Sequence, residues 1–253
     1  MSNLTVVILT KNEESNIAEV IANAKLVTDK VLIVDSGSTD KTVELAEANG
    51  AKVVFRAWDD DFSAQRNFAL QYVDTEWVVY LDADERINEK LAMEIKKAAE
   101  SSKCVMYKFI RINCAFGREF KYGVLGPDSA MRMFPKDKIK WQGKVHETPV
   151  CELPMCTLDG FLKHYTYEDF DEYIFKMNLY AKIGAQKYKE QNKKASIIKD
   201  ILFRPYLAFF KMYILKRGFL EGWYGFVLSV YYANYTLNKY IRLINMQKET
   251  RSE

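Results

Sequence analysis

Short apolar runs alternate with amphipathic stretches through the first hundred residues of this 253-residue chain. Continuous β-branched runs are typical of strands that are buried on both faces, and a period near 3.6 residues is typical of helices. The runs predict strands at residues 4–10, 30–34, 51–55 and 77–81. The stretches between and after them predict helices at residues 16–27, 45–48, 63–72 and 88–101. This alternation predicts an α/β fold with a parallel sheet and right-handed crossovers.

The pattern changes after Cys104. Residues 105–113 and 130–134 predict strands without long helices between them, so we expect an antiparallel extension of the sheet. From Tyr167 onward the spacing is helical, with two further helices expected at residues 197–216 and 219–246. We therefore expect an α/β domain at residues 1–166 and a C-terminal helical extension at residues 167–253.

Charge is distributed unevenly along the chain. With 49% hydrophobic residues it can form one sizeable core, or a main domain with an appendage. The net charge of +3 conceals a basic tail, because 13 Lys and Arg face 5 Asp and Glu from Lys187 onward, against 24 and 29 before it. This asymmetry predicts different roles for the two parts.

The basic tail is also aromatic. Its uncharged stretch at residues 222–237 is shorter than the ~20 apolar residues of a membrane span and contains Ser, Asn and Thr. Residues 203–217 place Arg and Lys beside Phe, Tyr and Leu, which suits an interfacial helix on anionic lipid. The alternative is a helix pair that packs on the rest of the chain or across a homo-oligomer interface.

Cysteine spacing and the N-terminus bear on the compartment. The four cysteines form no C-x-x-C pair, and the N-terminal residues enter a strand pattern without room for a targeting segment. We expect reduced thiols and a cytoplasmic protein, with peripheral contact on the inner face of a membrane as the tail's contribution.

Carboxylates follow the fourth predicted strand, in Asp82-Ala83-Asp84-Glu85. Burying like charges is costly without a positive partner, and hard oxygen ligands suit Mg²⁺ or Mn²⁺. Side chains alternate along an extended segment, so Asp82 and Asp84 are expected on one side. Glu85 is expected on the other, paired with Arg86 or Arg66. The alternative is a strand that stops in a solvated acidic turn.

Two more strand ends carry polar groups, namely Thr10-Lys11-Asn12-Glu13 and Asp35-Ser36-Gly37-Ser38. Ligands of open α/β sheets bind at the carboxyl ends of strands. The chain has neither G-x-G-x-x-G nor G-x-x-x-x-G-K-[ST] after its first strand, which disfavours a dinucleotide-binding Rossmann domain and a P-loop NTPase. Asp35 can accept hydrogen bonds from a base or ribose. Its alternative role is in the turn, with Asp40 or Thr39 capping the next helix.

These motifs resemble a known family. The segment from Val34 to Thr42 is similar to the D-[GS]-x-S-x-D-x-T signature of family 2 glycosyltransferases with the GT-A fold, and Asp82-Ala83-Asp84 resembles their D-x-D. The resemblance implies a mixed, mainly parallel sheet flanked by helices and an inverting enzyme. It also implies a UDP-sugar donor site at Thr10, Asn12, Glu13, Asp35, Ser36, Arg66, Asp82, Ala83 and Arg132. By the same resemblance, Mg²⁺ or Mn²⁺ is bound by Asp84, Asp82 and His164.

Three of these residues have alternatives. An Arg fork at Arg66 suits a diphosphate or a base edge, but Arg66 can also lie on a helix surface. Arg132 can steady the diphosphate or a loop, or form a salt bridge. His164 can complete the metal shell, since imidazole is compatible with Mn²⁺, or be a buried core histidine.

Lys144-Val145-His146-Glu147 resembles the V-H-E of family 2 enzymes of lipopolysaccharide inner-core assembly. An inverting transfer needs a base for the acceptor hydroxyl, and Glu147 or His146 can serve, unless the two form a structural pair. The resemblance implies a hexose, from UDP-glucose, moved to an inner-core heptose of a glycolipid, with no nucleic acid involved. A protein, capsular or teichoic glycan, or lipid carrier is the alternative acceptor.

Two other classes of protein remain as alternatives. A nucleotidyltransferase also uses paired carboxylates on an α/β sheet, but it usually has a Gly-rich basic loop after the first strand, which Thr10-Lys11-Asn12-Glu13 does not provide. A non-catalytic membrane- or nucleic-acid-binding module would explain the basic tail. It would leave the polar strand ends unexplained.

Overall fold

The structure is a computed structural model that describes residues 3–101, 105–143 and 147–252. Two compact units make up the chain. The first comprises Met1–Ile112 and Asp128–His164, and the second comprises Asn113–Pro127 and Tyr165–Glu253. The segment 113–127 thus groups with the C-terminal helices, although we expected the C-terminal extension to begin only at residue 167.

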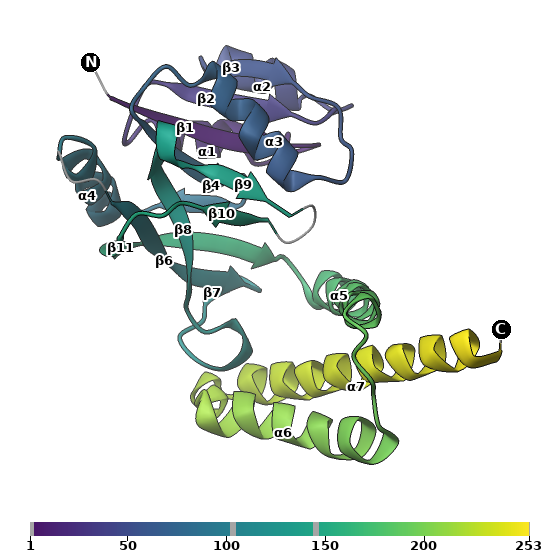
Figure 1. Ribbon diagram of the computed structural model, residues 1–253. Coiled ribbons are helices and arrows are strands. Elements are labelled where there is room, and N and C mark those ends of the chain that lie inside the picture. The colour runs from purple at the N-terminus through teal and green to yellow at the C-terminus, as the bar shows by residue number, and fades with distance from the viewer. Residues whose placement is uncertain (1–2, 102–104, 144–146, 253) are drawn as a thin grey trace. The chain divides into compact units, whose positions relative to one another are not determined.

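A mixed sheet forms the centre of the first unit (Figure 1). Its strands are β1 (Leu4–Thr10), β2 (Val31–Asp35), β3 (Lys52–Phe55), β4 (Trp77–Asp82), β5 (Glu85–Ile87), β6 (Met106–Ala115), β8 (Asp128–Pro135) and β11 (Met155–Tyr167), with the short β7 (Arg118–Glu119) beside β6. Their order is β3-β2-β1-β4-β8-β6-β11-β5. The first four strands pair in parallel, and β8 is antiparallel to both β4 and β6.

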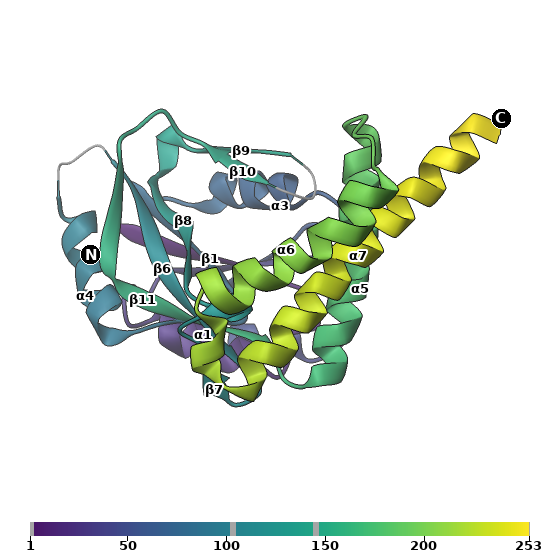
Figure 2. The ribbon, with the colours of Figure 1, turned by 90° about the horizontal axis from the view of Figure 1, so that it is seen from below.

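Helices and a hairpin cover the two faces of this sheet (Figure 2). Alternate side chains of β1 enter different cores: Val6 and Ile8 pack with α1 (Ile17–Ala24), α2 (Thr42–Ala48) and α4 (Glu89–Ala99). Val7 packs on the other side with α3 (Phe62–Ala69) and the hairpin of β9 (Lys140–Gln142) and β10 (Thr148–Val150). Burial on both faces explains why these strands read as unbroken apolar runs.

The predicted α/β fold, a mixed sheet flanked by helices with a C-terminal helical region, is confirmed. The antiparallel extension lies where we expected it, at β6 and β8. Strands β5 and β11 were not predicted; they pair antiparallel, with His164 opposite Glu85. Gly160 permits β11 to approach α4, because a Cβ there would lie 2.3 Å from the Leu91 backbone nitrogen.

The second unit is helical. It contains α5 (Phe170–Glu190), α6 (Arg204–Phe210) and α7 (Trp223–Ser252), with 3-10 turns at Gly123–Leu125 and Gly218–Glu221. The helix expected at residues 197–216 is α6 with a π-helical segment at each end, Ile197–Phe203 and Lys211–Leu215. Helices α6 and α7 run side by side (Figures 1 and 2).

Aromatic rings and one buried carboxylate hold the second unit together. The Phe116 ring stacks on Phe170 with 4.4 Å between centroids, and Tyr173 and Tyr224 pack around this pair. The Glu221 carboxylate accepts hydrogen bonds from the Arg118 guanidinium and from the backbone N–H groups of residues 121 and 122. The segment 113–127 is thereby fixed to the start of α7.

Within the described part of the chain, no helix has the length and apolarity needed to cross a membrane. This agrees with the reading of residues 222–237 as too short and too polar for a span.

Candidate active site

The strand register places three predicted site residues at one edge of the sheet. Thr10, the last residue of β1, pairs with Asp35, the last residue of β2. On the other side of β1, Leu9 pairs with Asp82, the last residue of β4. Polar groups that are far apart in the sequence thus lie on adjacent strands at their carboxyl ends, where open α/β sheets bind ligands.

The loop after β1 is fastened to the turn after β2 through Asn12. Asn12 has φ = 57°, a left-handed conformation that Asn tolerates better than most residues. Its side-chain oxygen accepts a hydrogen bond from the Thr39 backbone N–H at 2.8 Å, and its own N–H donates to Ser38 Oγ at 2.9 Å. These contacts give the first-strand motif one fixed shape.

Asp35 organises the turn with its own carboxylate. Oδ2 accepts hydrogen bonds from the backbone N–H groups of Gly37 and Ser38, and Oδ1 accepts one from Ser38 Oγ. The Asp40 carboxylate accepts from the Thr42 N–H at the start of α2, as expected. We expected the turn and ligand roles to use different side chains. Here the turn uses Asp35 itself, so any ligand would share its remaining lone pairs.

Thr10 and Ser36 lie beside this turn. The Ser36 N–H donates to the Thr10 carbonyl at 2.9 Å. The Thr10 side chain is buried, and its Oγ1 has no hydrogen-bond partner among the described residues. A buried hydroxyl without a partner costs free energy unless a ligand or water supplies one, so Thr10 is a good candidate for a ligand contact.

Glu13 lies close to the other carboxylates. Burial raises the pKa of Glu13, the hydrogen bond from Asn16 Nδ2 lowers it in part, and the charges of Asp84 and Asp40 raise it further. The contributions of Asp84 and Asp40, although smaller than that of burial, show that negative charges lie close together at this edge. A cation would relieve that repulsion.

Asp82 is held by two arginines. Its carboxylate is hydrogen bonded to Arg132 and lies 3.1 Å from Arg66 Nη2. Burial alone would raise the pKa of Asp82, but Arg132 and Arg66 together hold it well below its ordinary value. Asp82 is therefore an anion near neutral pH.

Glu85 is buried beneath this group with partners that we did not predict. It contacts Arg132 at 2.6 Å and Arg111 at 3.4 Å, so the expectation of Arg86 or Arg66 is wrong. The reason is the chain reversal at Ala83-Asp84, which turns Glu85 back toward β8 and β6. Burial raises the pKa of Glu85 despite the charge of Arg132.

Arg66 links two predicted parts of the site. Besides Asp82, its guanidinium contacts the Glu147 carboxylate at 3.3 Å from Nε, and it lies 4.8 Å from the Trp141 ring centroid and 5.2 Å from that of Tyr80. It is only 4% exposed, so the alternative of a helix-surface arginine is wrong. Stacking on two rings fixes the guanidinium plane.

The neighbours of Arg66 explain the Gln65-Arg66-Asn67 motif. Gln65 Nε2 donates to the carbonyls of Arg56 and Ala57, which secures the loop before α3. Asn67 makes two hydrogen bonds to the backbone of Trp141, both 2.9 Å long. Three successive side chains of α3 therefore have different partners. Gln65 binds the loop before the helix, Arg66 binds carboxylates of the site, and Asn67 binds the β9–β10 hairpin.

A pocket of about 490 Å³ opens between Asp82 and Glu147. It brings together residues that we predicted from four separate segments, namely Arg66, Asp82, Arg132 and Glu147. Of the two candidate bases, Glu147 borders the pocket, and His146 lies outside the described residues. A site with a carboxylate base candidate facing an arginine-bound carboxylate suits the transfer of a group to a hydroxyl.

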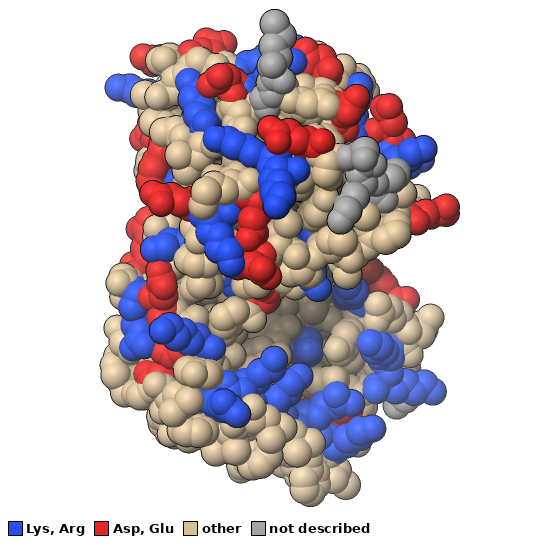
Figure 3. All heavy atoms as spheres, turned by 90° about the vertical axis from the view of Figure 1, so that its left-hand side faces the viewer, with Lys and Arg blue, Asp and Glu red and all other residues tan. Residues whose placement is uncertain are grey.

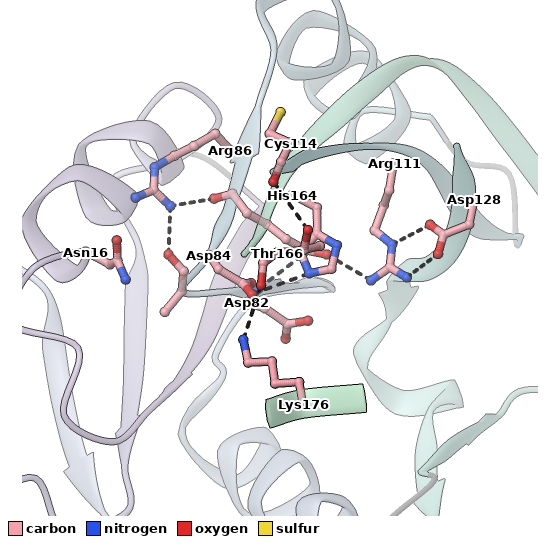
Figure 4. A network of polar contacts seen from close by, with 12 residues as sticks. Asn16, Asp82, Asp84, Arg86, Arg111, Cys114, Asp128, His164, Thr166 and Lys176 are labelled. Atoms are coloured by element: carbon pink, nitrogen blue, oxygen red, sulfur yellow. Dashed lines mark hydrogen bonds and ion pairs between the residues drawn. The ribbon is translucent and has the colours of Figure 1, made fainter. Parts of the chain in front are cut away.

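Asp84 and His164 are neighbours (Figure 4). His164 Nε2 lies 3.4 Å from Asp84 Oδ2, and His164 is partly exposed rather than a core histidine. A carboxylate and an imidazole are compatible with Mn²⁺, and such ions commonly complete their shells with phosphates and water. Among the described residues no three His, Cys, Asp or Glu side chains form a metal-binding group. Asp82 could join Asp84 and His164 through the lone pairs that its contacts with Arg66 and Arg132 leave over.

Ala83 lies in the turn between Asp82 and Asp84. It is buried, and its carbonyl accepts a 2.7 Å hydrogen bond from Arg86 Nη1. Arg86 thus braces the acidic turn, and Ala83 offers a ligand only its backbone N–H and methyl group.

Sequence reasoning missed Lys108 and Arg111, which also line the pocket. Arg111 is bound in fork fashion by Asp128, with both N–O distances 2.7 Å (Figure 4). The available signal was two cations within the mainly apolar strand Met106–Ala115. Charged residues there are unusual for a strand near a core.

Comparison with known sequences identifies the class of protein to which this fold and this edge of the sheet belong. The sequence model for "Glycosyl transferase family 2" matches residues 5–155, more than half of the chain, so the protein is a glycosyltransferase. It belongs to glycosyl transferase family 2. Family membership decides against the nucleotidyltransferase alternative.

Curated relatives and solved structures are similar to this chain to different extents. The "Uncharacterized glycosyltransferase RT0209" of Rickettsia typhi is 27% identical over 261 residues, which cover 98% of this chain and 88% of the relative. The glycosyltransferase SunS of Bacillus subtilis is 28% identical over 151 residues, or 58% of this chain and 35% of SunS. The structure of Staphylococcus aureus TarS 1-349 in complex with UDP is 16% identical, with a TM-score of 0.46 over 97% of this chain and 91% of that one.

Proposed function

We propose that this protein moves a hexose, with inversion, from a UDP-sugar to a hydroxyl of a glycolipid acceptor. The observation that carries the proposal is a pocket that Arg66, Asp82, Arg132 and Glu147 all border. It lies at the edge where Thr10 and Asp35 end their strands, so a donor bound there would reach from β2 to the pocket.

A single displacement accounts for the arrangement. Glu147 accepts the proton of the acceptor hydroxyl as that oxygen attacks the anomeric carbon. Arg66 and Arg132 face the negative charge that develops on the departing diphosphate, and their buried positions strengthen this interaction. His146 is the alternative base.

A divalent ion fits the acidic turn. Asp84 and His164, with Asp82 as a further ligand, would hold Mg²⁺ or Mn²⁺. When bound, the ion supplies electrostatic stabilisation of the leaving group. The closeness of Glu13 to Asp84 and Asp40 supports a cation here, because a positive charge would offset the repulsion among these carboxylates.

The particular substrates rest on sequence resemblance. The residues from Lys144 to Glu147 support UDP-glucose as the donor and a lipopolysaccharide inner-core heptose as the acceptor. The same chemistry on a protein, a capsular or teichoic glycan, or a lipid carrier is the alternative, and acceptor assays would separate them.

The second unit supports peripheral contact with an anionic membrane. Large apolar side chains around α6 are exposed, among them Tyr206 at 78% and Leu207 at 64%. Lys199, Lys211 and Lys216 are exposed beside them, and the nearby acids Asp200 and Glu221 are buried in ion pairs. Lys and Arg side chains gather over the C-terminal helices, at the bottom of Figure 3. Apolar and basic groups together suit an anionic lipid surface.

Glu147→Gln tests the catalytic proposal. Purified protein with Mn²⁺ should hydrolyse UDP-glucose and glucosylate truncated lipopolysaccharide that ends in inner-core heptose. We expect the variant to lose about 10²–10⁴-fold in kcat for transfer, because an amide cannot take the proton. The nearby, exposed Glu152→Gln should retain activity. Full transfer by Glu147→Gln would assign the base elsewhere.

A further inference from the structure

The cationic side chains around the pocket differ in whether they already contact a carboxylate. Four of the described residues that line it are cations: Arg66, Lys108, Arg111 and Arg132. The three arginines each contact at least two carboxylates, drawn from Asp82, Glu85, Asp128 and Glu147. They are therefore held in place before any ligand binds.

Lys108 differs from the arginines. It comes from β6, opposite Met131 of β8, and its side chain is half-buried. Its ammonium has no hydrogen bond or ion pair with any described residue, although it borders the same pocket. A partly desolvated charge without a partner is costly and gains more than an exposed lysine from an anionic ligand.

The sheet order places Lys108 away from the nucleoside. Thr10 and Asp35 lie on β1 and β2, Asp82 lies on the adjacent β4, and β8 and then β6 follow on the far side. At about 4.8 Å between strands, β6 lies about 10 Å beyond Asp82, in the direction opposite to β2. If the nucleoside binds at Thr10 and Asp35 and the diphosphate binds at Asp82, the hexose of the donor lies between the nucleoside and Lys108. Lys108 is then on the acceptor side of the hexose.

Two buried donors add to the positive character of the pocket. Arg66 Nη1 and Arg132 Nε have no hydrogen-bond partner among the described residues, and both residues are at most 5% exposed. These two serve the diphosphate in the proposed mechanism. Once they do so, Lys108 is the cation left for a second anion, with the Ser129 hydroxyl as a further donor on the pocket wall.

We propose that Lys108 binds a carboxylate or phosphate on the acceptor, so that the enzyme selects an anionic sugar over its neutral counterpart. This rests on the proposed function in one respect, that the pocket receives the acceptor beside Glu147. Lysine suits the task because its ammonium is a mobile point charge that does not require one fixed geometry.

A binding experiment tests the selection without any assumption about the natural acceptor. The full chain, saturated with UDP and Mn²⁺, is titrated by calorimetry with glucose, glucuronate and glucose 6-phosphate. We expect at least one anionic sugar to bind ten or more times as tightly as glucose. Glucuronate and the phosphate ester separate a carboxylate subsite from a phosphate subsite.

Lys108→Met keeps the apolar stem and removes the charge. It should abolish the preference for the anionic sugar, and Lys108→Arg should restore part of it. Lys97→Met, on the exposed face of α4, should behave as the unmodified protein. Thermal unfolding shows whether each variant is folded. Equal binding of neutral and anionic sugars, or a preference that survives in Lys108→Met, overturns the proposal.

A separate measurement distinguishes this inference from the proposed function. If Lys108→Met instead weakens UDP binding tenfold or more, then Lys108 serves the donor and the inference is wrong. If heptose is not glucosylated but anionic sugars still bind through Lys108, the acceptor assignment fails and the anionic subsite stands.

Discussion

At the scale of single residues, the site depends on Arg66. One guanidinium contacts both Asp82, the residue expected to face the diphosphate, and Glu147, the candidate base. The sequence suggested an arginine near the donor but left a surface position equally open. The packing of Tyr80 and Trp141 against the guanidinium shows that Arg66 is a buried site residue. These contacts join residues that are far apart in the chain, so the sequence alone could not show them.

Arg66→Lys should impair transfer strongly. A lysine keeps the charge but cannot contact two carboxylates in one plane or stack on two rings. We expect kcat/KM to fall about 10²-fold or more, in the range seen when one preorganised charge-stabilising donor is removed. Steady-state kinetics with UDP-glucose measure this. Arg56→Lys, whose arginine forms an ion pair with the local Asp59, is the matched control and should change kcat/KM little. Comparable rates for Arg66→Lys would contradict the role.

Asp82 predicts a pH dependence of stability. Its pKa in the folded protein is lowered by Arg132 and Arg66 against the effect of burial, so the folded state favours the anion. The resulting stabilisation is complete above the unfolded pKa of about 4 and is lost as pH falls through the lower folded value. Asp82→Asn should therefore lower Tm most near pH 7, and the difference should shrink below about pH 4.

Thermal unfolding followed by circular dichroism between pH 3 and 7 measures this difference. Glu85 has a raised pKa and the opposite pH trend, and loss of the Asp82 charge would lower the pKa of Glu85, so the measured difference in Tm includes both residues. Asp29→Asn, at an exposed position, provides the control. A gap in Tm that stays constant across the range would show that Asp82 is not preferentially ionised in the folded state.

At the scale of elements, β1, β2 and β4 could be predicted because each is a buried apolar run. The strands β5 and β11 could not. β5 is three residues long and consists of Glu85, Arg86 and Ile87, whose charges are buried only because β8, β6 and α1 supply partners. β11 is mixed in polarity, and its pairing with β5 is what brings His164 to Asp84.

Gly160 is a sensitive point in β11. Gly160→Ala would place a methyl group 2.3 Å from the Leu91 backbone nitrogen, which cannot move without shifting α4. We expect a loss of about 1–3 kcal/mol or more in the free energy of unfolding, as for overpacked cores.

Gly117→Ala separates this steric effect from backbone strain. Gly117 has φ = 73° and no heavy atom within 4 Å of the added Cβ, so its substitution should cost only about 1–2 kcal/mol through the left-handed conformation. Urea unfolding of both variants measures the two effects. If Gly160→Ala were as stable as the unmodified protein, the close packing of β11 on α4 would be wrong.

At the scale of the whole molecule, the charge asymmetry of the sequence corresponds to the two units. The family 2 motifs all lie in residues 1–164, whereas the C-terminal helices carry the exposed apolar and basic side chains. We expected the C-terminal region to begin at residue 167, and the last segment of the second unit begins at Tyr165. The inclusion of residues 113–127 could not be predicted, because it depends on Glu221 and on the ring of Phe116, contacts that have no local pattern.

Vesicle binding tests the function of the second unit. The full chain should cosediment with vesicles rich in phosphatidylglycerol, and less so in high salt, because screening weakens the attraction of lysines to lipid. The double substitution Phe203→Ser and Leu207→Ser should reduce binding tenfold or more. Met93→Ser, an exposed apolar residue of α4, should not. Dimerisation that the double substitution abolishes, without vesicle binding, would favour the oligomer interface instead.

The stacking of Arg66 on Trp141 has an optical consequence. The indole is 5% exposed and lies 4.8 Å from a guanidinium that, in the proposed mechanism, responds to the donor. A nearby cation shifts indole emission, so movement of Arg66 should change the fluorescence of this one tryptophan. With Trp58, Trp77 and Trp223 replaced by Phe, the emission of Trp141 would report occupancy of the pocket in real time, without labelled substrate.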